Sequence, residues 1–256
     1  MKRLLFFTLT ALFVVTVIFL QKELESDVRN TVDMKEKYVD ISKFGAKADD
    51  EIDDSQAIMD AIRTVDNAGG GIVHIPEGTY KLTSVNVAVT HPISITGEQG
   101  TVLDGKQSTK QYLFNIEGTR EKSAPLLADA VKNKKTIQAA LSVKPGDIVL
   151  FRSNELFNPV RNYYYRGEMA EVESVSGSEM TFKNGLFDAY RSSSTVIYKL
   201  NMPKISITGL KIIRDSNHAG LTINYARNVY LSNVEVFGAR ERGIGVSYIR
   251  RDDRKH

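Results

Sequence analysis

The feature that most constrains the fold is a set of short β-rich segments that recurs at intervals of twenty-odd residues. Ile205-Ser206-Ile207-Thr208 is followed 24 residues later by Val229-Tyr230-Leu231-Ser232, and Gly220-Leu221-Thr222-Ile223 is followed 23 residues later by Gly243-Ile244-Gly245-Val246. Self-similarity at such a period is typical of a solenoid, in which each repeat packs only on its neighbours. Because the repeating pieces resemble strands and not helices, the sequence predicts a parallel β-helix.

The same rhythm is present earlier in the chain. The pentapeptide Ile-Ser-Ile-Thr-Gly occurs at 93–97 and again at 205–209, and Ile72, Ile93 and Leu113 are 21 and 20 residues apart. We expect successive coils to stack about 4.8 Å apart and to bury their apolar inner rows in one continuous core. A leucine-rich repeat has a similar period, but its leucine-x-x-leucine-x-leucine pattern is missing.

One amphipathic helix is expected ahead of the first coils. Asp53-Asp54-Ser55 can accept hydrogen bonds from unpaired backbone N–H groups at a helix start. Apolar residues then follow the i, i+3, i+4, i+7 rule of a one-faced helix. These residues are Ile58, Ala61, Ile62 and Val65. Gly69-Gly70-Gly71 allows the left-handed backbone that ends a helix, and a strand follows at Ile72.

The stretch 120–200 lacks the low-twenties period. Lys144-Pro145-Gly146-Asp147 is a strong turn signal, and several strand-like runs surround it. These runs are Ile148–Phe151, Gly167–Val175, Glu179–Phe182 and Thr195–Tyr198. We predict a small antiparallel β subdomain inserted in the solenoid.

The N-terminus predicts an extracytoplasmic location. Met1-Lys2-Arg3 precedes an uncharged apolar run from Leu4 to Leu20, which is typical of an export signal. The run just reaches the length of a membrane-spanning helix, and no small-x-small cleavage motif follows it. We predict a secreted protein, or one held by an uncleaved membrane anchor, and favour the anchor. The predicted divisions are a signal peptide or signal anchor at 1–20, a linker at 21–37, an N-terminal cap and first coils at 38–119, the inserted β subdomain at 120–200, further coils at 201–249 and a charged tail at 250–256.

A family resemblance covers roughly Tyr38 to Val246. Its pieces are Tyr38-Val39-Asp40-Ile41, Phe44-Gly45-Ala46-Lys47, Asp53-Asp54-Ser55-Gln56-Ala57-Ile58, Ala68-Gly69-Gly70-Gly71-Ile72-Val73 and Ile75-Pro76-Glu77-Gly78-Thr79-Tyr80. In this order they resemble the start of pectate-lyase-superfamily proteins, which include rhamnogalacturonase- and polygalacturonase-like enzymes and phage tail-spike domains. The resemblance implies a right-handed parallel β-helix, a helix that caps its open end, and a carbohydrate polymer as the usual ligand. It does not imply one reaction, because relatives include hydrolases, lyases, epimerases and non-catalytic adhesins.

Chemical groups on a β-helix recur at the coil period, so the last two coils stack candidate binding residues on one another. In the Gly220/Gly243 register, His218 lies over Glu241 and Asn217 lies over Arg240, whereas Asp215 lies over Gly238 and has no acidic neighbour. Sugar hydrolysis requires two carboxyl groups across the scissile bond, so no catalytic residue is assigned. We predict that His218, Arg240, Glu241 and Arg242 bind an acidic saccharide; the alternative is a solvated turn between coils.

A second candidate is the aromatic run Tyr163, Tyr164 and Tyr165, which lies between Arg161 and Arg166. Aromatic faces can stack on sugar rings, and arginine can pair with uronate carboxylates. The alternative is an ordinary strand edge whose tyrosines cover the insertion.

Charge and composition limit the classes of ligand that the sequence predicts. Of the formal charge of +3, Lys2 and Arg3 contribute +2 and the 250–256 tail contributes +2, so the rest of the chain carries −1 and no nucleic-acid partner is predicted. The chain has no cysteine, and its four histidines show no metal-ligand spacing, so neither a metal nor a cofactor is predicted.

The functional prediction is a pectate-lyase-like protein that acts on or binds acidic polysaccharide. The alternatives are a non-catalytic saccharide-binding, tail-spike-like adhesin and an inactive truncated remnant, so enzyme activity stays open. The solenoid pattern ends after Ile249, whereas relatives continue for more coils that carry their catalytic groups. Either a partner or a homotrimer covers the open C-terminal end, or the chain is a truncated gene product; we favour truncation.

Overall fold

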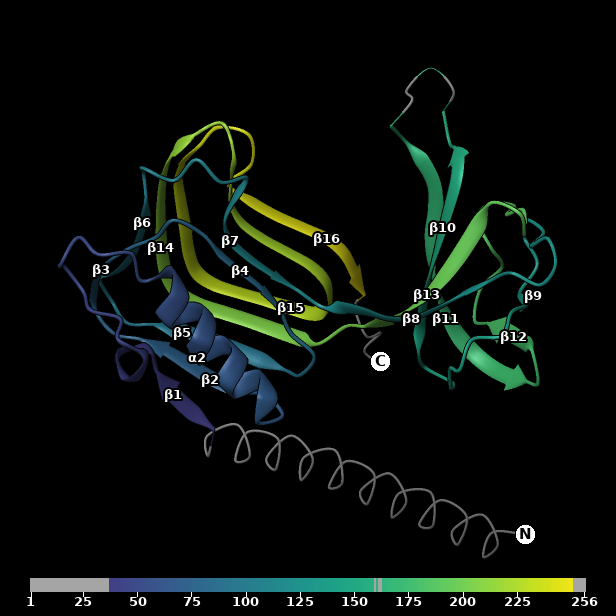
Figure 1. Ribbon diagram of the computed structural model, residues 1–256, viewed down its shortest axis with the longest axis horizontal. Helices are drawn as coiled ribbons and strands as arrows, with labels where there is room; N and C mark the ends of the chain where they lie inside the picture. The colour runs from purple at the N-terminus through teal and green to yellow at the C-terminus, as the bar shows by residue number, and fades with distance from the viewer. Residues whose placement is uncertain (1–36, 159, 161–162, 251–256) are drawn as a thin grey trace, which may run out of the picture.

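The computed structural model describes residues 37–158, 160 and 163–250, and it has two parts (Figure 1). A curled parallel sheet with one α-helix forms the first part, and a six-stranded antiparallel sheet forms the second. The predicted signal or anchor, almost all of the linker and all of the tail after Arg250 lie outside the described residues. Within the described ranges, no helix is long and apolar enough to cross a membrane.

The parallel part contains these elements in chain order: β1 (Tyr38–Asp40), η1 (Ile41–Phe44), α2 (Ser55–Asn67), β2 (Gly71–Ile75), β3 (Gly78–Lys81), β4 (Val85–Ala88), β5 (Ile93–Gly97), β6 (Thr101–Gly105), β7 (Tyr112–Glu117), β14 (Lys204–Ser216), β15 (Ala219–Ala239) and β16 (Ile244–Arg250). The antiparallel part contains β8 (Thr119–Pro125), β9 (Thr136–Gln138), β10 (Ile148–Leu156), β11 (Tyr165–Ser176), β12 (Glu179–Phe182) and β13 (Thr195–Asn201).

The parallel strands wind around three faces. Face 1 stacks β1, β2, β5, the start of β14 and the middle of β15. Face 2 stacks β3, β6, the end of β14 and the end of β15. Face 3 stacks β4, β7, the start of β15 and β16. The chain is therefore a right-handed parallel β-helix, and the predicted all-β fold class with an N-terminal helix is confirmed.

Apolar side chains stack in register on the inside of each face. The rows are Val39, Val73, Ile95, Ile207 and Leu231 on face 1; Tyr80, Leu103, Ile212 and Val236 on face 2; and Val87, Ile116, Ile223 and Val246 on face 3. Most of these side chains belong to one continuous buried core. This is the arrangement that the alternation of apolar and polar residues along each strand predicts.

The repeated pentapeptide stacks on itself. Ile93–Thr96 pairs residue for residue with Ile205–Thr208, because the intervening insertion loops out of the solenoid. The glycines that end the two copies pass so close that a Cβ on Gly209 would lie 2.4 Å from the carbonyl oxygen of Gly97. Gly209 also has a φ of +70°, so this corner requires glycine for space and for backbone conformation.

One expected repeat is wrong. Ile93 pairs with Gly71, not with Ile72, and Leu113 lies on β7 of face 3. The 20-residue step from Ile93 to Leu113 therefore joins two faces of the same coil. The error arises because each coil contains three short strands, so an apolar residue can recur at nearly the coil length without completing a turn.

The helix α2 closes the core beside the first coil (Figure 1). The side chains of Ile58, Ala61 and Ile62 are completely buried against the core. The expected cap is partly wrong: Asp53 accepts a hydrogen bond from the Ser55 backbone N–H at 3.1 Å, but the Asp54 side chain makes no cap bond. Asp54 instead accepts from the Lys47 backbone N–H at 3.0 Å, which ties the preceding loop to the helix start.

The insertion closes on itself. Its strands follow the order β8-β13-β10-β11-β12-β9, and a bridge between Leu126 and Ala139 joins the two outer strands. Phe151, Phe182 and Tyr190 pack their rings together in its core. Because this core is separate from that of the β-helix, the insertion is a small body of its own on one side of the solenoid (Figure 1).

Candidate functional site

The insertion meets the β-helix at a narrow junction. The chain leaves the solenoid at Gly118, whose backbone N–H donates to the Asn224 carbonyl at 2.9 Å, and it returns beside this point because Thr119 pairs with Asn201. A third apolar cluster fills the junction. It consists of Ile148, Leu150 and Leu200, with Met169, Tyr198, Met202 and Tyr225 packed against them.

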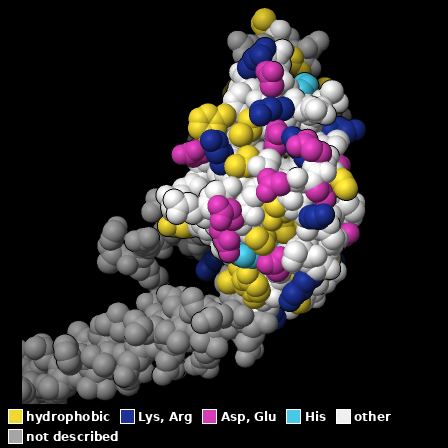
Figure 2. Space-filling view, turned by 90° about the vertical axis from the view of Figure 1, so that its left-hand side faces the viewer, with side chains coloured by type: hydrophobic (Ala, Val, Ile, Leu, Met, Phe, Trp, Pro, Cys, Tyr) yellow, Lys and Arg dark blue, Asp and Glu magenta, His cyan; other side chains and the backbone are white. Residues whose placement is uncertain are grey.

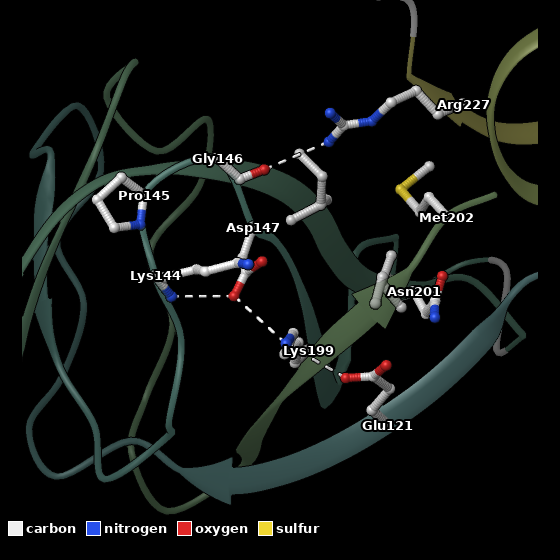
Figure 3. A pocket seen from close by; sticks show the side chains of 11 residues that line it. Glu121, Lys144, Pro145, Gly146, Asp147, Lys199, Asn201, Met202 and Arg227 are labelled. Carbon is white, nitrogen blue, oxygen red and sulfur yellow. Dashed lines mark hydrogen bonds and ion pairs between the residues drawn. The ribbon is translucent and has the colours of Figure 1, made fainter. Parts of the chain in front are cut away.

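A cleft of about 450 Å³ opens at this junction (Figure 3). Its walls come from four regions of the sequence: the start of the insertion, the turn that leads into β10, the strand that returns to the solenoid, and Arg227 on β15. The lining residues are Glu121, Lys144, Pro145, Gly146, Asp147, Ile148, Lys199, Leu200, Asn201, Met202 and Arg227. A volume of this size is within the range of small-ligand pockets.

Lys199 is the electrostatic centre of the cleft. Its Nζ lies 3.3 Å from a Glu121 carboxylate oxygen and 3.4 Å from Asp147 Oδ2 (Figure 3). Burial alone would lower the pKa of Lys199, but the charge of Asp147 and the hydrogen bond to Glu121 outweigh it, so the pKa is raised. The two carboxylates therefore favour the ammonium form of Lys199.

The remaining polar groups of the cleft are also anchored. Asp147 Oδ2 accepts a hydrogen bond from the Lys144 backbone N–H at 2.9 Å, and Arg227 donates to the Gly146 carbonyl at 3.3 Å across the junction. Both acids of the cleft, Glu121 and Asp147, form ion pairs with the same ammonium group of Lys199. With Lys144, Lys199 and Arg227 against Glu121 and Asp147, the lining has an excess of positive charge.

A second set of ion pairs joins the last described coil to the insertion. Arg250 on β16 and Lys183 both pair with the carboxylate of Glu171 on β11. Burial disfavours this carboxylate, but the Lys183 hydrogen bond and the charges of Arg250 and Arg227 act in the opposite direction and lower the pKa of Glu171. This group therefore stabilises the junction when it is ionised.

Acid is expected to weaken this connection. Because the folded-state pKa of Glu171 lies below its unfolded value, the stabilisation is fully present above the unfolded value and is lost as pH falls through the folded one. Glu171→Gln should cost about 1–2 kcal/mol at pH 7. Urea unfolding across a pH series checks this: the deficit should shrink on acidification, and a deficit independent of pH would contradict it.

The structure disperses the predicted cluster of His218, Arg240, Glu241 and Arg242. The last two coils do stack in the expected register, with Leu221 opposite Ile244. However, the Arg240 guanidinium turns to Asp215 at 2.7 Å, and Arg242 lies against Gly245 on face 3. With other described residues, the side chains of His218 and Glu241 form no hydrogen bond or ion pair. No contact among the described residues joins these four side chains directly, and their binding role stays a prediction.

The predicted aromatic run lies at the far end of the β10–β11 hairpin, away from the cleft (Figure 1). The rings of Tyr163 and Tyr164 are 4.6 Å apart and tilted by 41°, and the Tyr164 carbonyl accepts from the Phe157 backbone N–H at 2.7 Å. Tyr163 is 64% exposed and Tyr165 is 54% exposed. These exposures leave both predicted roles, sugar stacking and a strand edge that covers the insertion, as predictions.

Sequence reasoning missed the cleft residues. The turn at Lys144–Asp147 is the only sequence signal near the cleft, and nothing in the sequence places Arg227 beside it.

The face seen from the left of Figure 1 lacks the excess of positive charge found in the cleft. Basic and acidic side chains are interspersed on this face, with no large area of one sign (Figure 2). Among the described residues, no group of three or more His, Asp or Glu could hold a metal ion.

The geometry defines a β-helix with a lateral β insertion and a charged cleft between them. Residues 38–145 match a family model described as rhamnogalacturonase A/epimerase, pectate lyase-like. This part of the chain, less than half of its length, is similar to the pectate-lyase-like superfamily, and the parallel β-helix fold agrees with that similarity.

Two curated proteins are similar to part of the chain. Plasmin and fibronectin-binding protein A of Streptococcus pneumoniae is 34% identical over 89 residues, and alginate lyase 7 of Azotobacter vinelandii is 32% identical over 90 residues. These matches cover 33% and 35% of this chain but only 12% and 10% of the respective relatives.

Solved phage tailspikes share the fold. The tailspike of Pseudomonas phage phi297 has a TM-score of 0.63 at 21% identity, over 77% of this chain and 38% of the tailspike. The tailspike of Acinetobacter baumannii bacteriophage AP22, solved in complex with A. baumannii capsular saccharide, has a TM-score of 0.64 at 22% identity. That match covers 85% of this chain and 37% of the tailspike, so the chain spans well under half of either structure.

Proposed function

We propose that the chain is an extracytoplasmic protein that binds an acidic polysaccharide in the cleft between the insertion and the β-helix. The observation that carries this proposal is the excess of cationic side chains, Lys144, Lys199 and Arg227, in a cleft of about 450 Å³. Ammonium and guanidinium groups recognise carboxylates through charge-assisted hydrogen bonds. The capsular saccharide bound by one structural neighbour and the alginate lyase name of one relative support a saccharide ligand.

Binding is favoured over cleavage for a chemical reason. Both carboxylates of the cleft are held in ion pairs with Lys199 and are not arranged as the proton donor that glycoside hydrolysis requires, and the raised pKa of Lys199 favours its ammonium form over the neutral base that an elimination requires. The Tyr163–Tyr165 run and the Arg240–Arg242 turn remain additional contact surfaces within this proposal. Membrane anchoring through residues 1–20 and association into trimers are further parts of it.

The proposal predicts charge-dependent binding. Lys144 has an exposed side chain, so Lys144→Gln removes its charge without disturbing the backbone bond to Asp147. Titration calorimetry with tetragalacturonate should show binding about tenfold weaker in this variant. Lys135→Gln is the matched control, because Lys135 is an exposed lysine of the insertion that does not line the cleft.

Two results would contradict the proposal. Equal affinity for tetragalacturonate and for neutral galactotetraose would show that carboxylates are not recognised. Unsaturated products or new reducing ends after digestion of acidic polysaccharides would show a lyase or a hydrolase, and would contradict the binding-only part.

A further inference from the structure

Two tyrosines on successive coils form a stack at the junction. Tyr225 and Tyr248 occupy equivalent positions, because Asn224 pairs with Ser247 and Ala226 pairs with Ile249 on either side of them. Their ring centroids are 4.8 Å apart, and the ring planes differ by 23°. The pair marks the corner at which the chain turns from face 3 towards face 1.

Both tyrosines have an unfavourable backbone conformation. Their φ angles are +49° and +54°, in the left-handed region that bulky side chains rarely adopt. At the corner between face 1 and face 2, the same region is occupied by Gly209 and Asn233, which tolerate it. Strain of this kind is concentrated at functional sites.

Burial accounts for one tyrosine of the pair only. Tyr225 packs against the junction cluster of Ile148, Leu150 and Leu200. Tyr248, on the last described coil, is 52% exposed, and among the described residues its ring stacks on that of Tyr225.

Two exposed arginines of the insertion lie near Tyr225. The Arg120 guanidinium is 5.7 Å from the ring centre of Tyr198, which packs in the same cluster as Tyr225. Arg152 follows Leu150 by two residues on β10 and therefore projects from the same face of the sheet. Burial and Tyr248 raise the pKa of Tyr225, while the charges of Arg120 and Arg152 act to lower it, which is consistent with their proximity. With other described residues, neither arginine forms an ion pair.

We propose that Tyr225, Tyr248, Arg120 and Arg152 form a binding site for a uronate unit of an acidic polysaccharide. The sugar ring stacks on Tyr248, and its carboxylate pairs with the arginines, a combination of contacts that suits a carboxylated sugar and not a neutral one. Ile148 and Leu200 belong both to the cleft wall and to the cluster under Tyr225, so the site adjoins the cleft. This inference rests on the proposed function and names a second contact for the same polymer.

The backbone strain makes a sharp test possible. Asparagine tolerates the left-handed conformation, so Tyr248→Asn should fold with an unchanged or higher melting temperature. We expect its affinity for tetragalacturonate to fall about tenfold by titration calorimetry. Tyr230→Asn is the matched control, because Tyr230 is a 59% exposed tyrosine of β15 outside the site and should bind like the unaltered chain.

The arginines are tested by a double variant. Arg120→Gln with Arg152→Gln should weaken tetragalacturonate binding by a similar factor and leave the weak binding of galactotetraose unchanged, whereas Arg63→Gln on α2 should change neither. Unchanged affinity of Tyr248→Asn or of the double variant, together with weaker binding by Lys144→Gln, would overturn this site and leave the proposed function standing. Absence of binding by the unaltered chain would overturn both.

Discussion

Replacing Arg214 by methionine is expected to destabilise the β-helix by about 2–4 kcal/mol. Arg214 is only 1% exposed. Its Nε donates to Ser216 Oγ at 2.6 Å, its Nη1 donates to the Ala219 carbonyl at 2.5 Å, and its Nη2 donates to the Lys110 carbonyl. The guanidinium thus joins the turns of two successive coils, and its loss leaves their carbonyls without partners.

Removing the buried charge of Arg214 also has a stabilising effect, but it is smaller than the loss of the hydrogen bonds. Burial lowers the pKa of Arg214, which means that the folded state pays a desolvation cost for this charge, and methionine relieves that cost. Leaving the buried carbonyls unpaired costs more free energy than the desolvation of the guanidinium, so the substitution is expected to destabilise the fold. Urea unfolding measures the difference.

The neighbouring turn offers a control. Arg240→Met removes an arginine that pairs with Asp215, and each of these two side chains is 67% exposed. The free energy of unfolding of this variant should change by less than about 0.5 kcal/mol. Equal stability of the Arg214 and Arg240 variants would contradict a structural role for Arg214.

Gly118→Ala is expected to cost about 3 kcal/mol or more. A Cβ at this position would lie 2.1 Å from the Tyr225 carbonyl oxygen and 2.3 Å from the Asn201 carbonyl oxygen. Both are backbone atoms of the junction and cannot rotate away, so the crossing strands must separate. The separation also breaks the bond from the Gly118 N–H to the Asn224 carbonyl.

Gly243→Ala is the matched control for this variant. The nearest atom to its added Cβ would be a Val236 side-chain carbon at 3.8 Å, an ordinary contact. Thermal and urea unfolding should therefore separate the two variants clearly. If both lose the same stability, the loss comes from glycine as such and not from the close approach at the junction.

The repeat was sufficient to predict how the coils stack. The repeat of the segment that begins at Gly220 in the segment that begins at Gly243 predicts the correct register for the last two described coils. The duplicated pentapeptide marks two segments that lie side by side. This works because each strand needs the same alternation of inward apolar and outward polar residues, whatever the rest of the chain does. The register also places Tyr225 beside Tyr248, so the stacked pair had a signal in the sequence that was not recognised.

The direction of a side chain was not predictable in the same way. The register brings Arg240 near Asn217, but the guanidinium pairs with Asp215, because a long flexible side chain selects the nearest charge. The tyrosine run was recognised for its chemistry, yet its position at a hairpin tip depends on how the insertion folds.

The amino-acid sequence by itself determined the solenoid, its helix and the presence of an inserted β body, because these follow from local periodicity and turn chemistry. Only the tertiary structure decided which charges share a site. Glu121, Asp147 and Lys199 are brought together by strand pairing within the insertion, and Arg227 reaches Gly146 from the solenoid. The physical reason is that contacts between two separately folded bodies depend on the geometry of the junction, which no periodic pattern encodes.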